Sequence, residues 1–188
     1  MRIISGKARG TKLFTLEGQT TRPTLDRVKE SLFNILQNEI LESTFLDLFA
    51  GSGAIGLEAA SRGAKKVYLC EKDKQAVAIV RKNIEKTHLQ NIVELYPLDY
   101  QDFLYNLKEK VDLVYLDPPY KTDFAFNAIR ILVEKKLLYE NSCIIVETDQ
   151  DEVIKEIEDL PIVEIIDKRK YGRAFLLFLK ERETERKG

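Results

Sequence analysis

Four consecutive residues, Asp117-Pro118-Pro119-Tyr120, directly follow the apolar run at residues 111–116. Such a run indicates a buried strand, so the four residues lie where a parallel sheet opens to ligands. Pro118 has a fixed φ and no N–H, so its carbonyl can face a substrate N–H beside the Asp117 carboxylate, while Tyr120 offers a ring for stacking. The pattern predicts a holder for a planar base with an exocyclic amine, although a simple strand-ending turn would also use two prolines.

A glycine-rich turn lies earlier in the chain, after another apolar strand. Gly51, Gly53 and Gly56 follow the spacing G-x-G-x-x-G, which lets the backbone turn tightly toward a ligand and lets the next helix pack on its strand. Glu71 ends the following strand, where an acid can accept from both hydroxyls of a ribose. This spacing suits NAD as well as S-adenosylmethionine. Asp47 favours the second, because a carboxylate suits a ligand with an ammonium group better than one with a pyrophosphate.

The chemistry expected at these residues follows from the weakness of an aryl amine as a nucleophile, whose lone pair is delocalised into the ring. Hydrogen bonds from its N–H groups to Asp117 and to the Pro118 carbonyl favour the pyramidal nitrogen that develops during methyl transfer. Tyr120 would hold the ring so that nitrogen, methyl carbon and sulfur lie in line. We therefore expect direct transfer, with no covalent intermediate on Cys70 or Cys143.

With these motifs the chain resembles the class I S-adenosylmethionine-dependent methyltransferases, and among them the RsmD-type guanine-N2 methyltransferases of 16S ribosomal RNA. The segments at residues 21–24, 27–34 and 170–172 also match that family. The resemblance implies S-adenosylmethionine as the cofactor and the N2 amine of a guanine, presented on an assembling small ribosomal subunit, as the methyl acceptor. An N6-adenine methyltransferase acting on RNA or DNA is the alternative, since adenine also carries a conjugated exocyclic amine.

The resemblance also implies roles for individual residues. The catalytic residues are Asp117, Pro118 and Tyr120. The cofactor-binding residues are Asp47, Phe49, Gly51, Gly53, Glu71, Asp99 and Tyr100. Asp99 would contact the adenine amino group of the cofactor, but it also precedes an expected helix and could serve as its N-cap. No metal site is expected.

Basic residues gather at both ends of the chain, although the formal net charge of the whole is −1. Residues 1–29 hold seven Lys or Arg and two acids, and residues 168–188 hold eight and three. Clustered positive charge suits a polyanion, because each neutralised phosphate releases a counterion. We expect RNA contacts at Lys7, Arg9, Lys12, Arg22, Thr24 and Arg27, with solvated surface as the alternative. For residues 181–188 we prefer a frayed tail.

These motifs require a particular succession of elements to position them. Residues 1–20 contain two short strand candidates, at 2–5 and 11–16, which predict a basic N-terminal hairpin. Thr24 then precedes a helix of about sixteen residues, with apolar side chains at helical spacing from Leu25 to Ile40. Strands are expected at residues 45–49, 66–71, 92–98, 111–116, 143–147, 162–167 and 175–179, with helices between most of them.

This alternation predicts an α/β fold with a doubly wound, mostly parallel, seven-stranded Rossmann-like methyltransferase sheet, preceded by the small β-hairpin and helix. Only a short turn at residues 171–173 separates the last two strands, so the last strand is expected to run antiparallel. A length of 188 residues fits one domain, and we expect a single methyltransferase domain over residues 1–188.

Composition and motifs limit the cellular compartment in which the protein can work and the functions that it can have. The N-terminus lacks the apolar region of a signal peptide, no long apolar segment is present, and the two cysteines lie in apolar runs. We expect a cytoplasmic protein without a membrane partner. Three other functions stay open. A dehydrogenase leaves the motif at residues 117–120 unexplained, a protein-glutamine methyltransferase favours Asn in place of Asp117, and a non-enzymatic RNA-binding scaffold would not need intact motifs.

Overall fold

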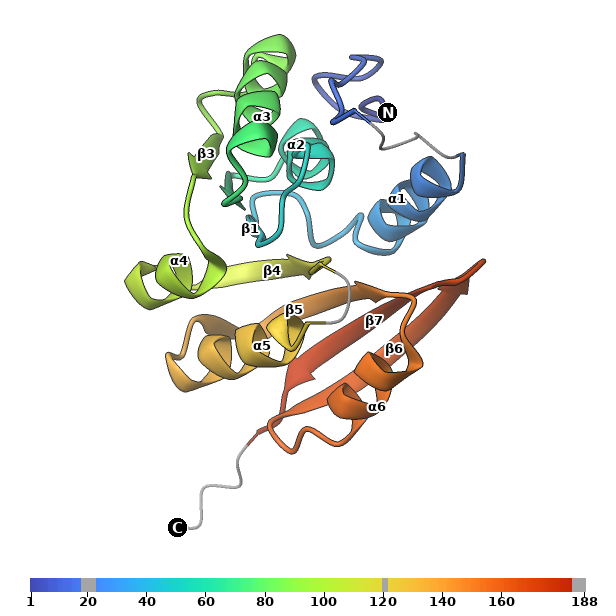
Figure 1. Cartoon of the computed structure of the whole chain (residues 1–188), viewed down its shortest axis with the longest axis vertical. Helices are drawn as coiled ribbons and strands as arrows, with labels where there is room; N and C mark the ends of the chain where they lie inside the picture. The colour runs from blue at the N-terminus through green and yellow to red at the C-terminus, as the bar shows by residue number, and fades with distance from the viewer. Residues whose placement is uncertain (18–22, 120–121, 184–188) are drawn as a thin grey trace.

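The computed structural model describes residues 1–17, 23–119 and 122–183. Within these residues the chain forms six helices and seven strands (Figure 1). The helices are α1 (Pro23–Ile35), α2 (Ala54–Ser61), α3 (Lys74–Thr87), α4 (Tyr100–Asn106), α5 (Phe124–Glu134) and α6 (Asp151–Glu158). The strands are β1 (Thr44–Asp47), β2 (Lys66–Cys70), β3 (Val93–Tyr96), β4 (Val111–Leu116), β5 (Leu138–Thr148), β6 (Val163–Tyr171) and β7 (Ala174–Glu181). None of these helices is long and apolar enough to span a membrane.

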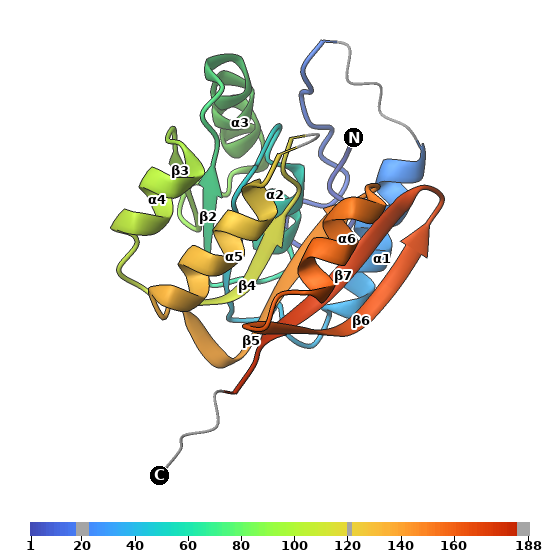
Figure 2. The ribbon, with the colours of Figure 1, turned by 60° about the horizontal axis from the view of Figure 1, so that its bottom comes forward.

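The described strands join in one sheet, in the order β3-β2-β1-β4-β5-β7-β6. Neighbours from β3 to β5 pair in parallel, whereas β7 lies antiparallel to both β5 and β6. Figure 2 shows β5, β7 and β6 side by side, with α6 packed against them. The predicted Rossmann-like sheet with its antiparallel last strand is confirmed. The strand order reverses between β1 and β4, and open α/β sheets bind ligands at such a point.

Side chains alternate between the two faces of the sheet, as the period of a strand requires. Phe45 and Leu113 belong to one hydrophobic core, and their neighbours Leu46 and Val114 belong to the other. The N-terminal segment and α1 to α3 cover the first face, and α4 to α6 cover the second (Figure 1). Burial on both faces explains why the central strands are nearly continuous apolar runs in the sequence.

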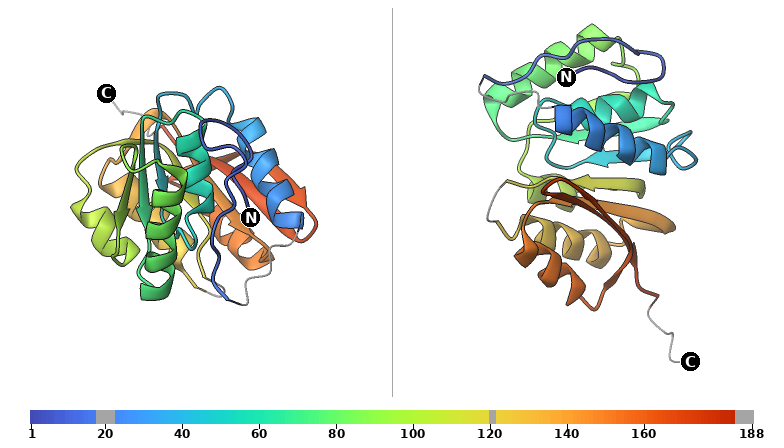
Figure 3. Two further views of the ribbon diagram at one scale, coloured as in Figure 1. Left: turned by 90° about the horizontal axis from the view of Figure 1, so that it is seen from above. Right: turned by 90° about the vertical axis from the view of Figure 1, so that its right-hand side faces the viewer.

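The first seventeen residues lie along α2 and α3 and are held there by polar groups (Figure 3). Glu58 of α2 accepts from the backbone N–H groups of residues 4–5 and forms an ion pair with buried Lys29 of α1 (Nζ···Oε2 3.2 Å). In this part of the described chain the predicted hairpin contains a single antiparallel bridge, between Arg2 and Lys12, and no strand. Backbone hydrogen bonds still join the two arms, from the Ile3 N–H to the Thr11 carbonyl and from the Leu13 N–H to the Met1 carbonyl. The N–H groups of residues 4, 5, 7 and 8 donate to α2, so the ladder stays short.

Helix α1 differs from the helix predicted after Thr24. It begins at Pro23, so Thr24 lies inside its first turn. Proline is favoured there because a backbone N–H at that position would have no partner within the helix. The helix ends at Ile35, yet Leu36 and Ile40 beyond it remain buried. The apolar spacing therefore marked the core contacts correctly but not the end of the helix.

Strand boundaries depart from the predictions mainly where polar residues extend a strand. β5 starts at Leu138 where the prediction had Cys143, and β6 continues to Tyr171, past the predicted end at residue 167. β1, β2 and β3 end one or two residues earlier than predicted, as the chain turns at the carboxyl edge. Glu181 still belongs to β7, and the Arg182 N–H donates to the backbone carbonyl of Ile162, just before β6. The tail predicted from residue 181 is therefore wrong at these two positions.

Candidate active site

The turn between β1 and α2 lies at the carboxyl edge of the sheet. Gly51 and Gly53 have φ values of 57° and 81°, a region that favours glycine. A Cβ at Gly51 would meet no atom within 4 Å, so this side of the turn faces open space. A Cβ at Gly56 would lie 2.2 Å from Leu69 Cδ2, so glycine there lets α2 pack closely on β2. The turn is thus as tight as the spacing predicted, and it leaves open space beside Gly51.

A cavity of about 260 Å³ opens beside this turn, and we call it the glycine-side cavity. Among its lining residues are Phe49, Gly51, Glu71, Asp99, Tyr100 and Asp117, all predicted site residues. Glu71 is oriented by backbone donors: its Oε2 accepts from the Gly51 N–H (2.8 Å) and its Oε1 from the Asp73 N–H (2.9 Å). A carboxylate oxygen can accept a second hydrogen bond, so Glu71 can also bind a ligand hydroxyl.

Aromatic rings form another part of the glycine-side cavity. The ring centroids of Phe49, Tyr100 and Phe124 lie 5.2, 6.1 and 5.0 Å apart, which gives an apolar surface suited to a flat ring. Asp99 stands beside them, capping the N-terminus of α4 through Oδ1 (3.0 Å) and pairing through Oδ2 with Lys72 Nζ (3.2 Å). Asp99 therefore serves as the N-cap of α4, as the alternative interpretation expected, and it also lines the glycine-side cavity.

Asp47 lies at the end of β1, beneath the glycine turn, and is only 1% exposed. Its Oδ2 accepts from the Gly56 N–H (3.1 Å), whereas no group in the described part of the chain donates to its buried Oδ1. Burial raises the pKa of Asp47 to about 7; the hydrogen bond from Gly56 opposes this rise and Glu71 adds to it. A buried oxygen without a donor favours a ligand with a cationic N–H group over one with a phosphate.

Asp117 follows β4 and lines the glycine-side cavity together with two further cavities. The residue is exposed, and cavities lie on several sides of it. Restricted hydration between the protein walls raises the pKa of Asp117 well above the usual range, and the acids Glu147, Asp47 and Asp149 add to the rise. Although these acids gather here, no group of three or more His, Cys, Asp or Glu among the described residues could hold a metal ion.

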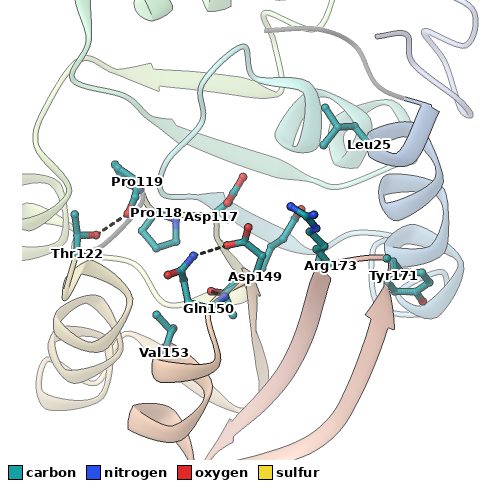
Figure 4. Close-up of a pocket in the computed structure, with 14 residues that line it drawn as sticks. Leu25, Asp117, Pro118, Pro119, Thr122, Asp149, Gln150, Val153, Tyr171 and Arg173 are labelled. Carbon is teal, nitrogen blue, oxygen red and sulfur yellow. Dashed lines mark hydrogen bonds between the residues drawn. The ribbon is translucent and has the colours of Figure 1, made fainter.

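The cavity on the other side of Asp117 has a volume of about 540 Å³, and we call it the Asp117-side cavity. The two prolines at residues 118–119 line it together with residues after β5 and in the turn between β6 and β7. Figure 4 shows Asp117, Asp149 and Arg173 close together in this cavity. Tyr120, which was predicted to stack on the base, lies outside the described residues.

The predictions missed the contribution of β5 and of the β6–β7 turn. Glu147 and Asp149 line the Asp117-side cavity from the end of β5, and Arg173 lines it from the turn. An acid that follows a buried apolar run is the same signal that identified Glu71, so Glu147 could have been found in this way. The segment at residues 170–172, which matched only by resemblance, reaches the cavity through its last two residues.

The residues predicted to contact RNA lie in the N-terminal segment and at the start of α1. The exposed ones are Lys7, Arg9, Lys12 and Arg27. Arg22 lies outside the described residues, and of Thr24 only its place in α1 is described. Leu25, which was predicted to face the core, is 40% exposed and lines the Asp117-side cavity. The start of α1 therefore borders the cavity directly.

Three comparisons with known proteins agree with this geometry. Residues 1–180 match the family described as conserved hypothetical protein 95. The chain is 42% identical over 155 residues to the ribosomal RNA small subunit methyltransferase D of Haemophilus influenzae, which is 80% of each protein. The solved structure of yhhF from Escherichia coli has a TM-score of 0.83 and 29% identity, covering 98% of this chain and 99% of that one. A solved hypothetical protein from Thermus thermophilus has a TM-score of 0.77 and 32% identity, covering 97% and 99%.

Proposed function

The chain belongs to the RsmD-type methyltransferase family described as conserved hypothetical protein 95, and we propose that it methylates the N2 amine of a guanine in 16S ribosomal RNA, with S-adenosylmethionine as the donor. One observation carries the proposal: Asp117 lines both the glycine-side and the Asp117-side cavity. A donor in the first cavity and an acceptor in the second would meet at this carboxyl group. The Haemophilus influenzae relative, a ribosomal RNA small subunit methyltransferase, supports RNA as the acceptor.

The residues around the glycine-side cavity fit S-adenosylmethionine. When bound, this cofactor supplies a methyl group on a sulfonium sulfur, which an amine nitrogen can attack. Glu71 would accept from the ribose hydroxyls, while Phe49 and Tyr100 would enclose the adenine ring beside Asp99. Asp47 lines a neighbouring cavity of about 430 Å³ that shares Phe49 and Gly51 with the glycine-side cavity, and there it would stabilise the ammonium group, because its buried Oδ1 lacks a donor. NAD would place a pyrophosphate near this acid, at an electrostatic cost.

Asp117 and Pro118 prepare the substrate amine for attack. The carboxylate and the proline carbonyl accept from the two N–H bonds, which favours a pyramidal nitrogen with a localised lone pair. The amine must lose a proton once it is methylated, and the raised pKa of Asp117 suits its carboxylate to accept that proton. Tyr120 would stack on the base and hold the nitrogen in line with the methyl carbon and sulfur.

The RNA would be selected by shape and charge around the N-terminal segment. Its exposed basic residues, with Arg22 and Arg27, would neutralise phosphates near the target. The guanine would be unpaired or flipped out, because an N2 amine in a duplex is buried against its partner base. We place the reaction on an assembling small ribosomal subunit in the cytoplasm.

Analysis of modified nucleosides tests the proposal. The protein is incubated with methyl-labelled S-adenosylmethionine and with small ribosomal particles, free 16S ribosomal RNA or DNA, and the nucleosides are then separated and identified by mass. We expect label in N2-methylguanosine, and about 100- to 1,000-fold slower labelling with the Asp117→Ala protein. Label in N6-methyladenosine or in DNA would contradict the assigned substrate, and label in protein glutamine would contradict RNA as the acceptor.

A further inference from the structure

Glu147 stands beside Asp117 at the carboxyl edge of the sheet. β4 and β5 pair with Leu116 opposite Val146, so the next residues of the two segments, Asp117 and Glu147, are neighbours. Both line the Asp117-side cavity and a third cavity of about 430 Å³ that Asp47 also lines. Two carboxyl groups therefore border the space in which the proposed function places the substrate base.

Glu147 is held in place from within the fold. The hydroxyl of Tyr115, a residue only 3% exposed, donates to Glu147 Oε2. Tyr115 itself packs in the core between the sheet and α1 to α3. Within the residues that the structure describes, no group donates to Glu147 Oε1. One carboxylate oxygen is thus anchored within the fold, while the Glu147 side chain lines the cavity in which a ligand would bind.

Two adjacent acceptors match only one of the bases that carry an exocyclic amine. Guanine presents two neighbouring donors on its Watson–Crick edge, the N2 amine and N1–H. Adenine and cytosine present the amine next to a ring nitrogen that is itself an acceptor. A second carboxylate beside the one that binds the amine would meet a donor on guanine, but a lone pair on adenine or cytosine.

We propose that Glu147 is the residue that selects guanine, with its Oε1 accepting from guanine N1–H while Asp117 accepts from the N2 amine. This inference rests on the proposed function and deepens it, since it assigns the choice of base to one side chain. It also explains why an acid is anchored by a buried tyrosine at the mouth of a cavity that already contains Asp117.

The base analogue 2-aminopurine tests the inference, because it keeps the amine at C2 but has no N1–H. The kcat/KM of wild-type protein and of Glu147→Gln is measured on ribosomal RNA with either guanine or 2-aminopurine at the methylated position. Wild-type protein should prefer guanine by roughly 10- to 100-fold, the usual effect of one unmet base contact. In Glu147→Gln the Tyr115 hydroxyl can donate to the amide oxygen, which turns an N–H₂ toward the base. The preference should then fall to within about threefold, because the amide suits an acceptor at N1.

Two further variants and one binding measurement keep the test decisive. Glu152→Gln changes an exposed acid in the first turn of α6 and should keep the wild-type preference. Tyr115→Phe keeps the Glu147 carboxylate but removes its anchor, and should reduce the preference by less than Glu147→Gln does. S-adenosylmethionine binding, measured by calorimetry, should be unchanged in all of these variants.

The possible results separate the two proposals. If Glu147→Gln loses the same factor on both RNAs and keeps the preference for guanine, Glu147 only supports Tyr115 and the inference is overturned. If wild-type protein forms no N2-methylguanosine on the guanine RNA, the proposed function itself is overturned, together with the role of Glu147.

Discussion

The two cavities that meet at Asp117 differ in how the chain builds them. The glycine-side cavity is lined by residues between 48 and 124, which follow the consecutive strands β1 to β4 and begin α4 and α5. The Asp117-side cavity draws on α1, on the ends of β4 and β5, and on the β6–β7 turn, which lie far apart in the sequence. Both cavities thus join several segments, but the Asp117-side cavity depends on packing between segments that lie farther apart in the sequence.

Their electrostatics differ as well. In the glycine-side cavity Glu71 accepts from two backbone N–H groups, which orient its carboxylate. On the other side Asp117, Glu147 and Asp149 lie together, and the pKa values of Asp117 and Glu147 are raised, first by restricted hydration and then by neighbouring acids. The glycine-side cavity thus holds an acid that can accept a hydrogen bond from a neutral hydroxyl. The acids of the Asp117-side cavity can accept hydrogen bonds from N–H donors and can also take up a proton.

Removing the group that the cavities share should have the largest effect. Asp117→Ala should lower turnover by about 100- to 1,000-fold, because it deletes an acceptor that acts in the transition state. The affinity for S-adenosylmethionine should stay close to the wild-type value, since the glycine turn and Glu71 are intact. Asp102→Ala, at an exposed acid of α4, is the matched control. A fully active Asp117→Ala protein would mean that the two substrates do not meet at this residue.

The pH dependence of the reaction should report the same group. Asp117 accepts hydrogen bonds and a proton only when ionised, and its pKa is raised. The kcat/KM should therefore fall, by up to about tenfold per pH unit, as pH is lowered through a value above the usual range of a carboxyl group. Steady-state rates between pH 5 and 9 measure this. An activity that is flat down to the ordinary pKa of aspartate would contradict the proton-accepting role.

The glycine-side cavity is tested by Glu71→Ala. The change should weaken S-adenosylmethionine binding by about 2 to 3 kcal/mol through the loss of charge-assisted hydrogen bonds, while turnover at saturating cofactor stays nearly constant. Calorimetry measures the binding, and Glu85→Ala on the exposed face of α3 is the control. Tight binding of NAD without binding of S-adenosylmethionine would invalidate the assignment of this cavity.

Asp47 lies beneath both sites and predicts a pH-dependent difference in stability. Its folded-state pKa of about 7 exceeds the ordinary value of 3.8, so its protonated form is favoured in the folded protein and stability is lost as pH rises through 7. Asp47→Asn should lack this loss, so its free energy of unfolding at pH 8 should exceed that of wild type by about 1 to 2 kcal/mol. The gain is smaller than the full cost of ionising Asp47, because the new amide N–H₂ lacks an acceptor. Urea unfolding at pH 5 and pH 8, without cofactor, measures the difference. An equal gain at both pH values would show that ionisation is not its cause.

The smallest effect is expected on the approach of RNA to the Asp117-side cavity. Neutralising Arg9, Arg22 and Arg27 together should flatten the salt dependence of RNA binding by up to about three units of slope and leave cofactor binding unchanged. Filter binding at several salt concentrations measures the slope. Arg130→Gln, on α5 at the other face of the sheet, is the control. An unchanged slope in the triple variant would assign these arginines to ordinary solvated surface.

Local patterns predicted much of the fold and several of the residues that line the two cavities. The apolar runs located the strands because a strand buried on both faces must be apolar throughout. They missed the start of β5 and the end of β6, whose polar residues give no such signal. Gly51, Glu71 and Asp117 were found because each occupies a fixed place relative to the end of its own strand.

The sequence by itself determined the strand succession, the glycine turn and the acids that follow β2 and β4, because each depends on residues close together in the chain. Only the tertiary structure decided that Asp117 borders two cavities, that Glu147 stands beside it, and that the β6–β7 turn lines the acceptor side. Those facts depend on strand order, and β7 enters the sheet between β5 and β6. Strand order is set by packing among distant segments, which no local spacing records.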